Sequence, residues 1–326
     1  YKRQASMSSL KYEITQIPIS PVKIKNKKST IMTQTVKEYR NDAIHFGEWC
    51  KKNRGIRHLD ELCAQKVTLL QDYADDLAAQ GKSAATIHKY MSGACRVFGV
   101  ELGSITKPQR SVADVTRSRG RKPVDERADA QREASPRLYD FAERVGIRRA
   151  EYAALLGSDF GEDEVGPYVL VRRGKGGKRQ KQRLLPSDAD FVRAYFDGSE
   201  ELVFSEAEMR NKIDLHHLRA MQGQRVLQYY TDRCDNEPGY REKLLRDIKC
   251  IWDEDDIKRK TNGLRRKHWH EGLYTGRYYL RGRTRTLALQ LGLPVTYDRL
   301  CVLAVSVFHL SHWRLDVTVD NYLLAQ

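Results

Sequence analysis

The second half of this chain contains side chains that could together cleave a phosphodiester. Tyr322 lies ten residues after His312 and could attack phosphorus through its phenol oxygen. A free tyrosine titrates near pH ~10, so it needs neighbouring cations or a proton acceptor to react at neutral pH. Arg148 and Arg219 suit a phosphate because their planar guanidinium groups donate paired hydrogen bonds to its oxygens. This set predicts phosphoryl transfer in which arginines balance the negative charge that builds up in the reaction.

A histidine and a carboxylate are spaced to assist the two arginines. His216 precedes Arg219 by three residues, so the two side chains share one face of the predicted helix and could contact one anion. His217 is the alternative histidine, although it faces away from Arg219. Glu151 follows Arg148 by three residues and could hold that arginine in place.

Lys175 lies in a glycine turn between two apolar segments. Glycines precede and follow it, and the residues at 168–173 and 182–186 read as two strands of a hairpin. Because glycine has no side chain, such a turn can approach a ligand closely and bring the lysine into a groove.

Taken in order along the chain, these motifs resemble the tyrosine recombinase (phage integrase) family. Gly-Ile-Arg-Arg-Ala-Glu at 146–151 is similar to the box of the first arginine, and Gly-Lys-Gly at 174–176 to the hairpin lysine. His-His-Leu-Arg at 216–219 is similar to the His-x-x-Arg box, followed by His312 and the tyrosine nucleophile Tyr322. The helical region 30–103 resembles the core-binding domain of the family, so the resemblance covers nearly the whole chain.

The resemblance implies a mechanism and a set of partners. Tyr322 would attack the scissile phosphate of duplex DNA, form a 3′-phosphotyrosyl link and free a 5′-hydroxyl. Lys175 would protonate the leaving oxygen, His216 would act as general acid/base or transition-state donor, and His312 would donate to a phosphate oxygen. A homotetramer on paired DNA sites is implied, with no metal ion and no cofactor. Tyr297 is the weaker alternative nucleophile.

The preferred role is site-specific recombination that integrates or excises a mobile element. An Xer-like resolvase or an invertase would use the same residues. A type IB topoisomerase would share the chemistry without bringing two sites together. A catalytically inactive DNA-binding regulator would keep the fold, although it would have no need for the complete set of six side chains.

Two spacings depart from the family pattern. The interval from His312 to Tyr322 is one residue longer than usual, which predicts a bulge before the tyrosine at Asp320 and Asn321. The interval from Arg219 to His312 is much longer than usual and contains an insertion at about 232–294 that is rich in basic and aromatic residues. This insertion could contact DNA or another protomer, or it could be a solvated excursion on the surface.

Composition supports a nucleic-acid partner. The 326 residues include 58 Lys and Arg against 43 Asp and Glu, a net charge of +15, which favours a polyanion. The longest apolar run, Leu300 to Leu310, is shorter than a membrane span and predicts a buried helix. No apolar signal segment follows the basic N-terminus, which predicts a cytoplasmic protein associated with the nucleoid. The six cysteines form no C-x-x-C pair, and His268 and His270 lack further ligands at metal-binding spacing.

The predicted fold is mainly α with a small β-hairpin, arranged as a two-domain DNA clamp. We expect a basic N-terminal arm (1–30), a helical core-binding domain (31–103), a basic linker (104–130) and a catalytic domain (131–326). In the helical domain, apolar periodicity predicts a helix from about Thr33 and a second over 64–79 with Val67 on its apolar face. Gly81 would end that helix and Ser83 would cap the next.

Overall fold

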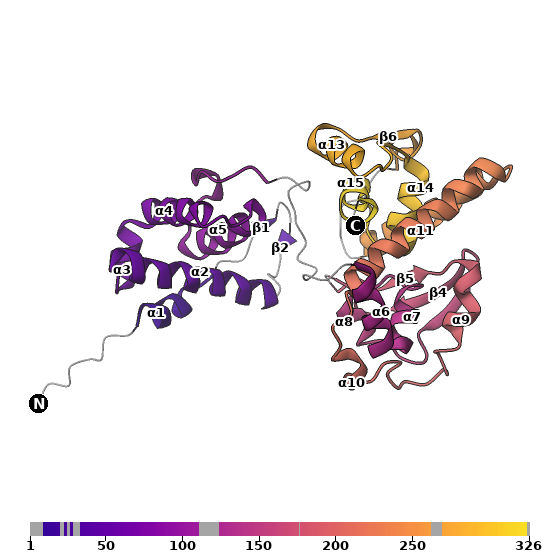
Figure 1. Cartoon of the computed structure of the whole chain (residues 1–326), viewed down its shortest axis with the longest axis horizontal. Helices are drawn as coiled ribbons and strands as arrows, with labels where there is room; N and C mark the ends of the chain where they lie inside the picture. Colours follow the sequence, from indigo (N-terminus) through magenta and orange to yellow (C-terminus); the bar gives the residue numbers. More distant parts are fainter. Residues whose placement is uncertain are drawn as a thin grey trace, which may run out of the picture. The chain divides into compact units, whose positions relative to one another are not determined.

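The computed structural model is mostly helical and contains small antiparallel sheets, in agreement with the predicted class (Figure 1). It describes residues 9–19, 23–24, 27–28, 33–110, 124–175, 177–261 and 269–324. The chain divides into two compact units, Tyr1–Arg117 and Ser118–Gln326. Within the described ranges no helix has the length and apolar character needed to cross a membrane.

The first unit is a helical bundle around one apolar core. Its elements are α1 (Leu10–Gln16), β1 (Lys23–Ile24), β2 (Lys27–Lys28), α2 (Thr33–Arg54), α3 (Leu59–Ala64), α4 (Lys66–Ala79), α5 (Ala84–Phe98) and a 3-10 turn at Leu102–Ser104. Phe46, Leu70 and Met91 are fully buried in the core, so α2, α4 and α5 each contribute an apolar face to it.

The predicted signals at the helix ends are present. The Thr86 amide donates to Ser83 Oγ over 3.2 Å at the start of α5, and Gly81 after α4 has a left-handed φ of 70°. The prediction for Val67 was wrong, because this side chain is 48% exposed. Val67 lies in the first turn of α4, and the core face of that helix begins at Leu69.

The region 1–30, expected to be a basic N-terminal arm, contains a packed helix. Ser9 Oγ accepts a hydrogen bond from the Tyr12 amide and caps α1. Leu10 and Ile14, four residues apart, are buried against the core of the first unit. A Cβ at Gly47 would lie 2.3 Å from Ile14 Cδ1, so the glycine in α2 allows the two helices to approach. The prediction missed this short apolar repeat because the surrounding sequence is basic.

The second unit combines helices with a three-stranded sheet. Its elements up to α11 are α6 (Val124–Ala134), α7 (Pro136–Ala142), α8 (Arg149–Tyr152), β3 (Phe160–Asp163), β4 (Gly166–Val171), β5 (Gln180–Arg183), a 3-10 turn at Pro186–Asp188, α9 (Ala189–Arg193), α10 (Glu206–Met209) and α11 (Leu215–Asn236). Strands β4 and β5 are antiparallel and flank Lys175, as the glycine turn predicts, and β3 pairs with the other edge of β4. The end of the expected linker over 104–130 lies in α6, and residues 111–123 fall outside the described part.

The remaining elements complete the second unit. They are α12 (Tyr240–Thr261), a 3-10 turn at Glu271–Leu273, β6 (Arg277–Tyr279), α13 (Gly282–Gln290), β7 (Thr296–Asp298), α14 (Arg299–Ala304), a π-helical turn at Val305–His309, α15 (Leu315–Thr318) and a second π-helical turn at Val319–Leu323. Strands β6 and β7 are antiparallel, with Tyr278 opposite Tyr297. The predicted buried helix over Leu300–Leu310 is present as α14 and the first π-helical turn.

Part of the predicted insertion at 232–294 belongs to the core, which excludes a purely solvated excursion. Residues 232–236 continue α11, and α12 places Leu244 and Ile248 in the same apolar cluster as Tyr322. The Trp252 ring packs edge-on against Trp313, with ring centroids 5.0 Å apart. The apolar side chains of α12 recur every four residues and form one stripe along the helix, which explains their burial.

Candidate active site around Tyr322

Three of the predicted residues meet at the predicted tyrosine. The His216 and His312 rings lie 5.6 Å and 6.0 Å from the Tyr322 ring, measured between centroids. The Arg219 guanidinium carbon lies 5.5 Å from the centre of the same ring. We refer to His216, Arg219, His312 and Tyr322 as the Tyr322 cluster. Tyr322 is buried, and His216 is the exposed member of the cluster.

Arg219 is held in place in the second turn of α11. Its side chain is fully buried, and Nη2 donates to the Leu310 carbonyl over 2.8 Å while Nη1 donates to the Gly146 carbonyl. Burial lowers the pKa of Arg219, and the neighbouring Tyr322 phenol, its hydrogen-bond partner, opposes this shift. A guanidinium remains protonated in proteins, so a fixed cation stands beside the phenol of Tyr322.

Glu151 connects the first arginine to the lysine hairpin. Its buried carboxylate accepts hydrogen bonds from Arg148 Nη1 over 2.7 Å and from the Arg148 amide over 2.8 Å. The Lys175 amide donates to the same carboxylate over 3.3 Å. A Cβ at Gly174 would lie 3.2 Å from Glu151 Oε1, so the turn approaches the carboxylate closely. The Lys175 side chain itself is exposed.

His312 is neutral at physiological pH and oriented by Ser306. Burial, together with the positive charges of Arg219 and Arg148, lowers the pKa of His312 to about 4. Ser306 Oγ donates its proton to the His312 carbonyl and lies 3.1 Å from His312 Nδ1. The tautomer with the proton on Nδ1 satisfies both contacts, because Nδ1 then donates to Ser306 Oγ while the hydroxyl donates to the carbonyl. In this tautomer the buried Nε2 atom, which has no hydrogen-bond partner within the described part of the chain, carries a lone pair and can accept a proton.

The interval between His312 and Tyr322 ends in a π-helical turn. The segment Val319–Leu323 includes Tyr322, and the Leu324 amide donates to the Val319 carbonyl, five residues earlier, over 3.0 Å. Inserting one residue into an α-helix produces a turn of this kind. The predicted bulge is therefore a widened helical turn that contains the tyrosine.

A buried network behind the cluster was missed by the sequence prediction. The fully buried His309 ring lies 3.2 Å from Gln222 Nε2 through Nδ1 and 2.9 Å from the Tyr230 hydroxyl through Nε2. Burial and the charge of Arg225 lower the pKa of His309 to about 3, so this ring is neutral. Gln182 of the hairpin donates to the His309 carbonyl. The network joins α11 and the sheet to the segment that carries His312.

Two signals in the sequence could have indicated this network. Gln222 follows Arg219 by three residues and shares its helix face, and His309 is the one histidine in the apolar run 300–310. A Cβ at Gly146 would lie 2.7 Å from Gln222 Oε1. Gly146 thus allows Gln222 and Arg219 to pack against the segment that leads to Arg148.

Tyr297, the alternative nucleophile, lies outside the Tyr322 cluster. Tyr297 is buried in β7 within the cluster that includes Leu280 and Val302, while Tyr322 contacts Arg219.

Over the described ranges no group of three or more His, Cys, Asp or Glu side chains could hold a metal ion. No protein-family model, curated protein or solved structure matches the chain.

Proposed function

We propose that this chain is a site-specific DNA recombinase that cuts and rejoins duplex DNA through a phosphotyrosyl intermediate at Tyr322. The observation that carries the proposal is the meeting of Arg219, His216 and His312 around Tyr322, although His312 is more than ninety residues from Arg219 in the sequence. A buried arginine and two imidazoles around one phenol are what attack on a phosphodiester requires.

The reaction would exchange one phosphate ester for another. Tyr322 Oη forms a bond to phosphorus, the bond from phosphorus to the 5′-oxygen breaks, and the proton of the phenol passes to His312 Nε2. Lys175 supplies the proton that the 5′-oxygen takes up. The hydrogen bonds of His312 support an acceptor role in place of the donor role that the family resemblance implies.

Arg148 and Arg219 would bind the non-bridging oxygens of the phosphate. Arg219 is fixed by two backbone carbonyls, and Arg148 is fixed by Glu151. Because both guanidiniums are already held in place, they need not reorganise as negative charge develops on the phosphate, and this lowers the activation barrier of cleavage. His216 is on the exposed side of the cluster, so the phosphate would approach from that side.

The wider role follows from charge and chemistry. A net charge of +15 favours duplex DNA as the partner. The two compact units would act as a two-domain DNA clamp, and exchange between two duplexes needs four cleavages, hence a homotetramer on paired sites. Integration or excision of a mobile element is the preferred role. Resolution, inversion, topoisomerase activity and DNA binding without catalysis are the alternatives.

The test is a search for the covalent intermediate in the presence of a metal chelator. A pool of nicked duplexes with randomised inverted arms would be incubated with the protein, and complexes that survive denaturing detergent would be recovered and sequenced. We expect adducts with the wild type and with Tyr297→Phe, and none with Tyr322→Phe. DNA binding without any adduct from the pool would favour the regulator, and adducts with Tyr322→Phe would exclude Tyr322 as the nucleophile.

A further inference from the structure

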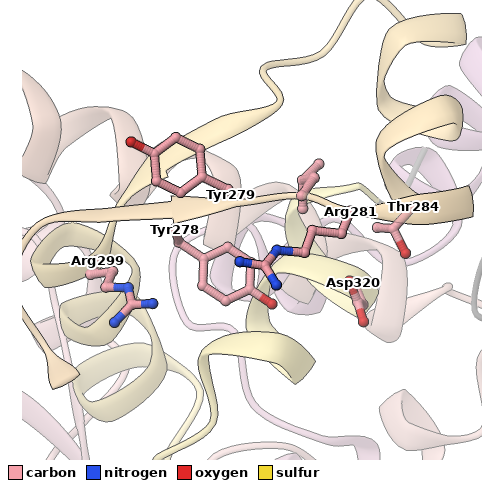
Figure 2. A pocket seen from close by; sticks show the side chains of 7 residues that line it. Tyr278, Tyr279, Arg281, Thr284, Arg299 and Asp320 are labelled. Carbon is pink, nitrogen blue, oxygen red and sulfur yellow. The ribbon is translucent and has the colours of Figure 1, made fainter.

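A cavity of about 440 Å³ lies next to the segment that carries Tyr322. It is lined by Tyr278, Tyr279, Leu280, Arg281, Thr284, Arg299 and Asp320 (Figure 2). All of these residues belong to the second unit, and Asp320 lies in the same π-helical turn as Tyr322. We call this cavity the β6–α13 pocket. Its volume falls within the range of roughly 300–1,000 Å³ that is typical of small-ligand sites.

One part of the pocket favours an anion. Arg281 is exposed, and its guanidinium makes no ion pair or hydrogen bond with any other residue in the described ranges. Arg299 Nη1 makes a long bond of 3.4 Å to the Leu273 carbonyl, and its Nε has no partner within those ranges. Arg281 is also the N-cap of α13 and gives that helix no side-chain cap, so the amide donors of its first turn, including that of Thr284, have no partner from the capping side chain.

The rest of the pocket does not suit a simple anion. Tyr278, Arg281 and Asp320 lie on one side of the β6 ribbon and Tyr279 lies on the other (Figure 2). Burial and the nearby Asp316 raise the pKa of Asp320, and its carboxyl forms no ion pair with any cation among the described residues. A bare phosphate would leave this carboxyl unused. A nucleotide would match both parts, because it joins a phosphate for the arginines to a base that can donate to a carboxylate and pack against a tyrosine.

We propose that the β6–α13 pocket binds one unpaired nucleotide of the cleaved DNA strand, with its phosphate at Arg281 and Arg299 and its base at Asp320. This inference rests on the proposed function. Cleavage by Tyr322 frees a strand with a 5′-hydroxyl end, and its nucleotides must leave the original duplex before they can join another. A pocket that Asp320 lines, two residues before the tyrosine in the chain, would hold that strand between cleavage and rejoining, and it would give part of the long insertion a role.

The pocket can be tested by single-strand binding in the full chain carrying Tyr322→Phe, which removes the proposed nucleophile. The probe is a fluorescein-labelled six-nucleotide DNA strand, followed by fluorescence anisotropy over a range of salt concentrations. Adding Arg281→Gln to the Tyr322→Phe variant should weaken binding of this strand about tenfold. It should also lower the slope of the logarithm of the binding constant against the logarithm of the salt concentration by about 0.7, the value for one lost single-strand phosphate contact. Arg285→Gln removes the same charge from α13 outside the pocket and should change the affinity less than twofold.

Equal losses with Arg281→Gln and Arg285→Gln would overturn the proposal, because they would indicate diffuse attraction to a basic surface. Base contact is tested with Asp320→Ala, which should abolish a preference for cytosine or adenine strands over strands of abasic sites. An unchanged preference would refute the placement of the base. Failure of the proposed function is seen separately, as the absence of a Tyr322-dependent adduct on nicked duplexes.

Discussion

Replacing Glu151 by glutamine should loosen both the Arg148 side chain and the hairpin that carries Lys175. Oε1 accepts from Arg148 Nη1 and the Lys175 amide, and Oε2 accepts from the Arg148 amide. An amide has one oxygen, so at best Glu151→Gln keeps the two bonds at Oε1 and presents an NH₂ group to the Arg148 amide. An unsatisfied buried donor costs about 1–3 kcal/mol, and loss of the charge on a charge-assisted bond costs about 1 kcal/mol more. We expect a loss of about 2–4 kcal/mol in the free energy of unfolding.

The same change should slow formation of the covalent adduct by about a hundredfold, since removal of one fixed transition-state donor has that effect. Urea unfolding followed by circular dichroism measures the first quantity, and single-turnover adduct formation on the selected nicked duplex measures the second. Glu206→Gln is the matched control. Its carboxylate is 81% exposed and pairs with Arg210 on the surface, so it should cost about 0–1 kcal/mol. Unchanged stability and rate in Glu151→Gln would refute the reasoning about this carboxylate.

Two further predictions concern the segment before the tyrosine. Folding lowers the pKa of His309 from 6.5 to about 3 and that of His312 from 6.5 to about 4. Below pH 6.5 both histidines are therefore protonated in the unfolded chain while they stay neutral in the folded chain. Each histidine should therefore reduce stability by up to about 1.4 kcal/mol per pH unit as the pH falls from 6.5. His309→Gln should make the urea concentration at the unfolding midpoint depend less on pH. The same pH dependence as in the wild type would contradict burial of a neutral His309 ring. Ser311 has a left-handed φ of 55° and a buried hydroxyl without a partner in the described ranges. Ser311→Gly should stabilise the protein by about 0.5–1 kcal/mol, and a lower melting temperature would show that this backbone is not strained.

The local features of this protein follow from the sequence alone. The helix from Thr33, the cap at Ser83 and the hairpin around Lys175 depend on side-chain periodicity and on turn chemistry within a few residues. The residue types of the Tyr322 cluster could also be selected, because an arginine and histidine three apart and a late tyrosine are recognisable without coordinates. Whether these side chains cut DNA remains a prediction.

Long-range packing decided the rest. The apolar repeats of α1 and α12 mark the faces that are buried, but the surfaces that cover these faces lie far away in the chain and are not specified by any local pattern. The proton position on His312 depends on Ser306, and the carbonyls that fix Arg219 come from Gly146 and Leu310. The β6–α13 pocket likewise exists only because α13, β6 and the turn at Asp320 come together. Residue types thus determined which chemistry is available, whereas tertiary contacts determined the orientation, charge state and neighbours of each group, because these depend on atoms brought together only by folding.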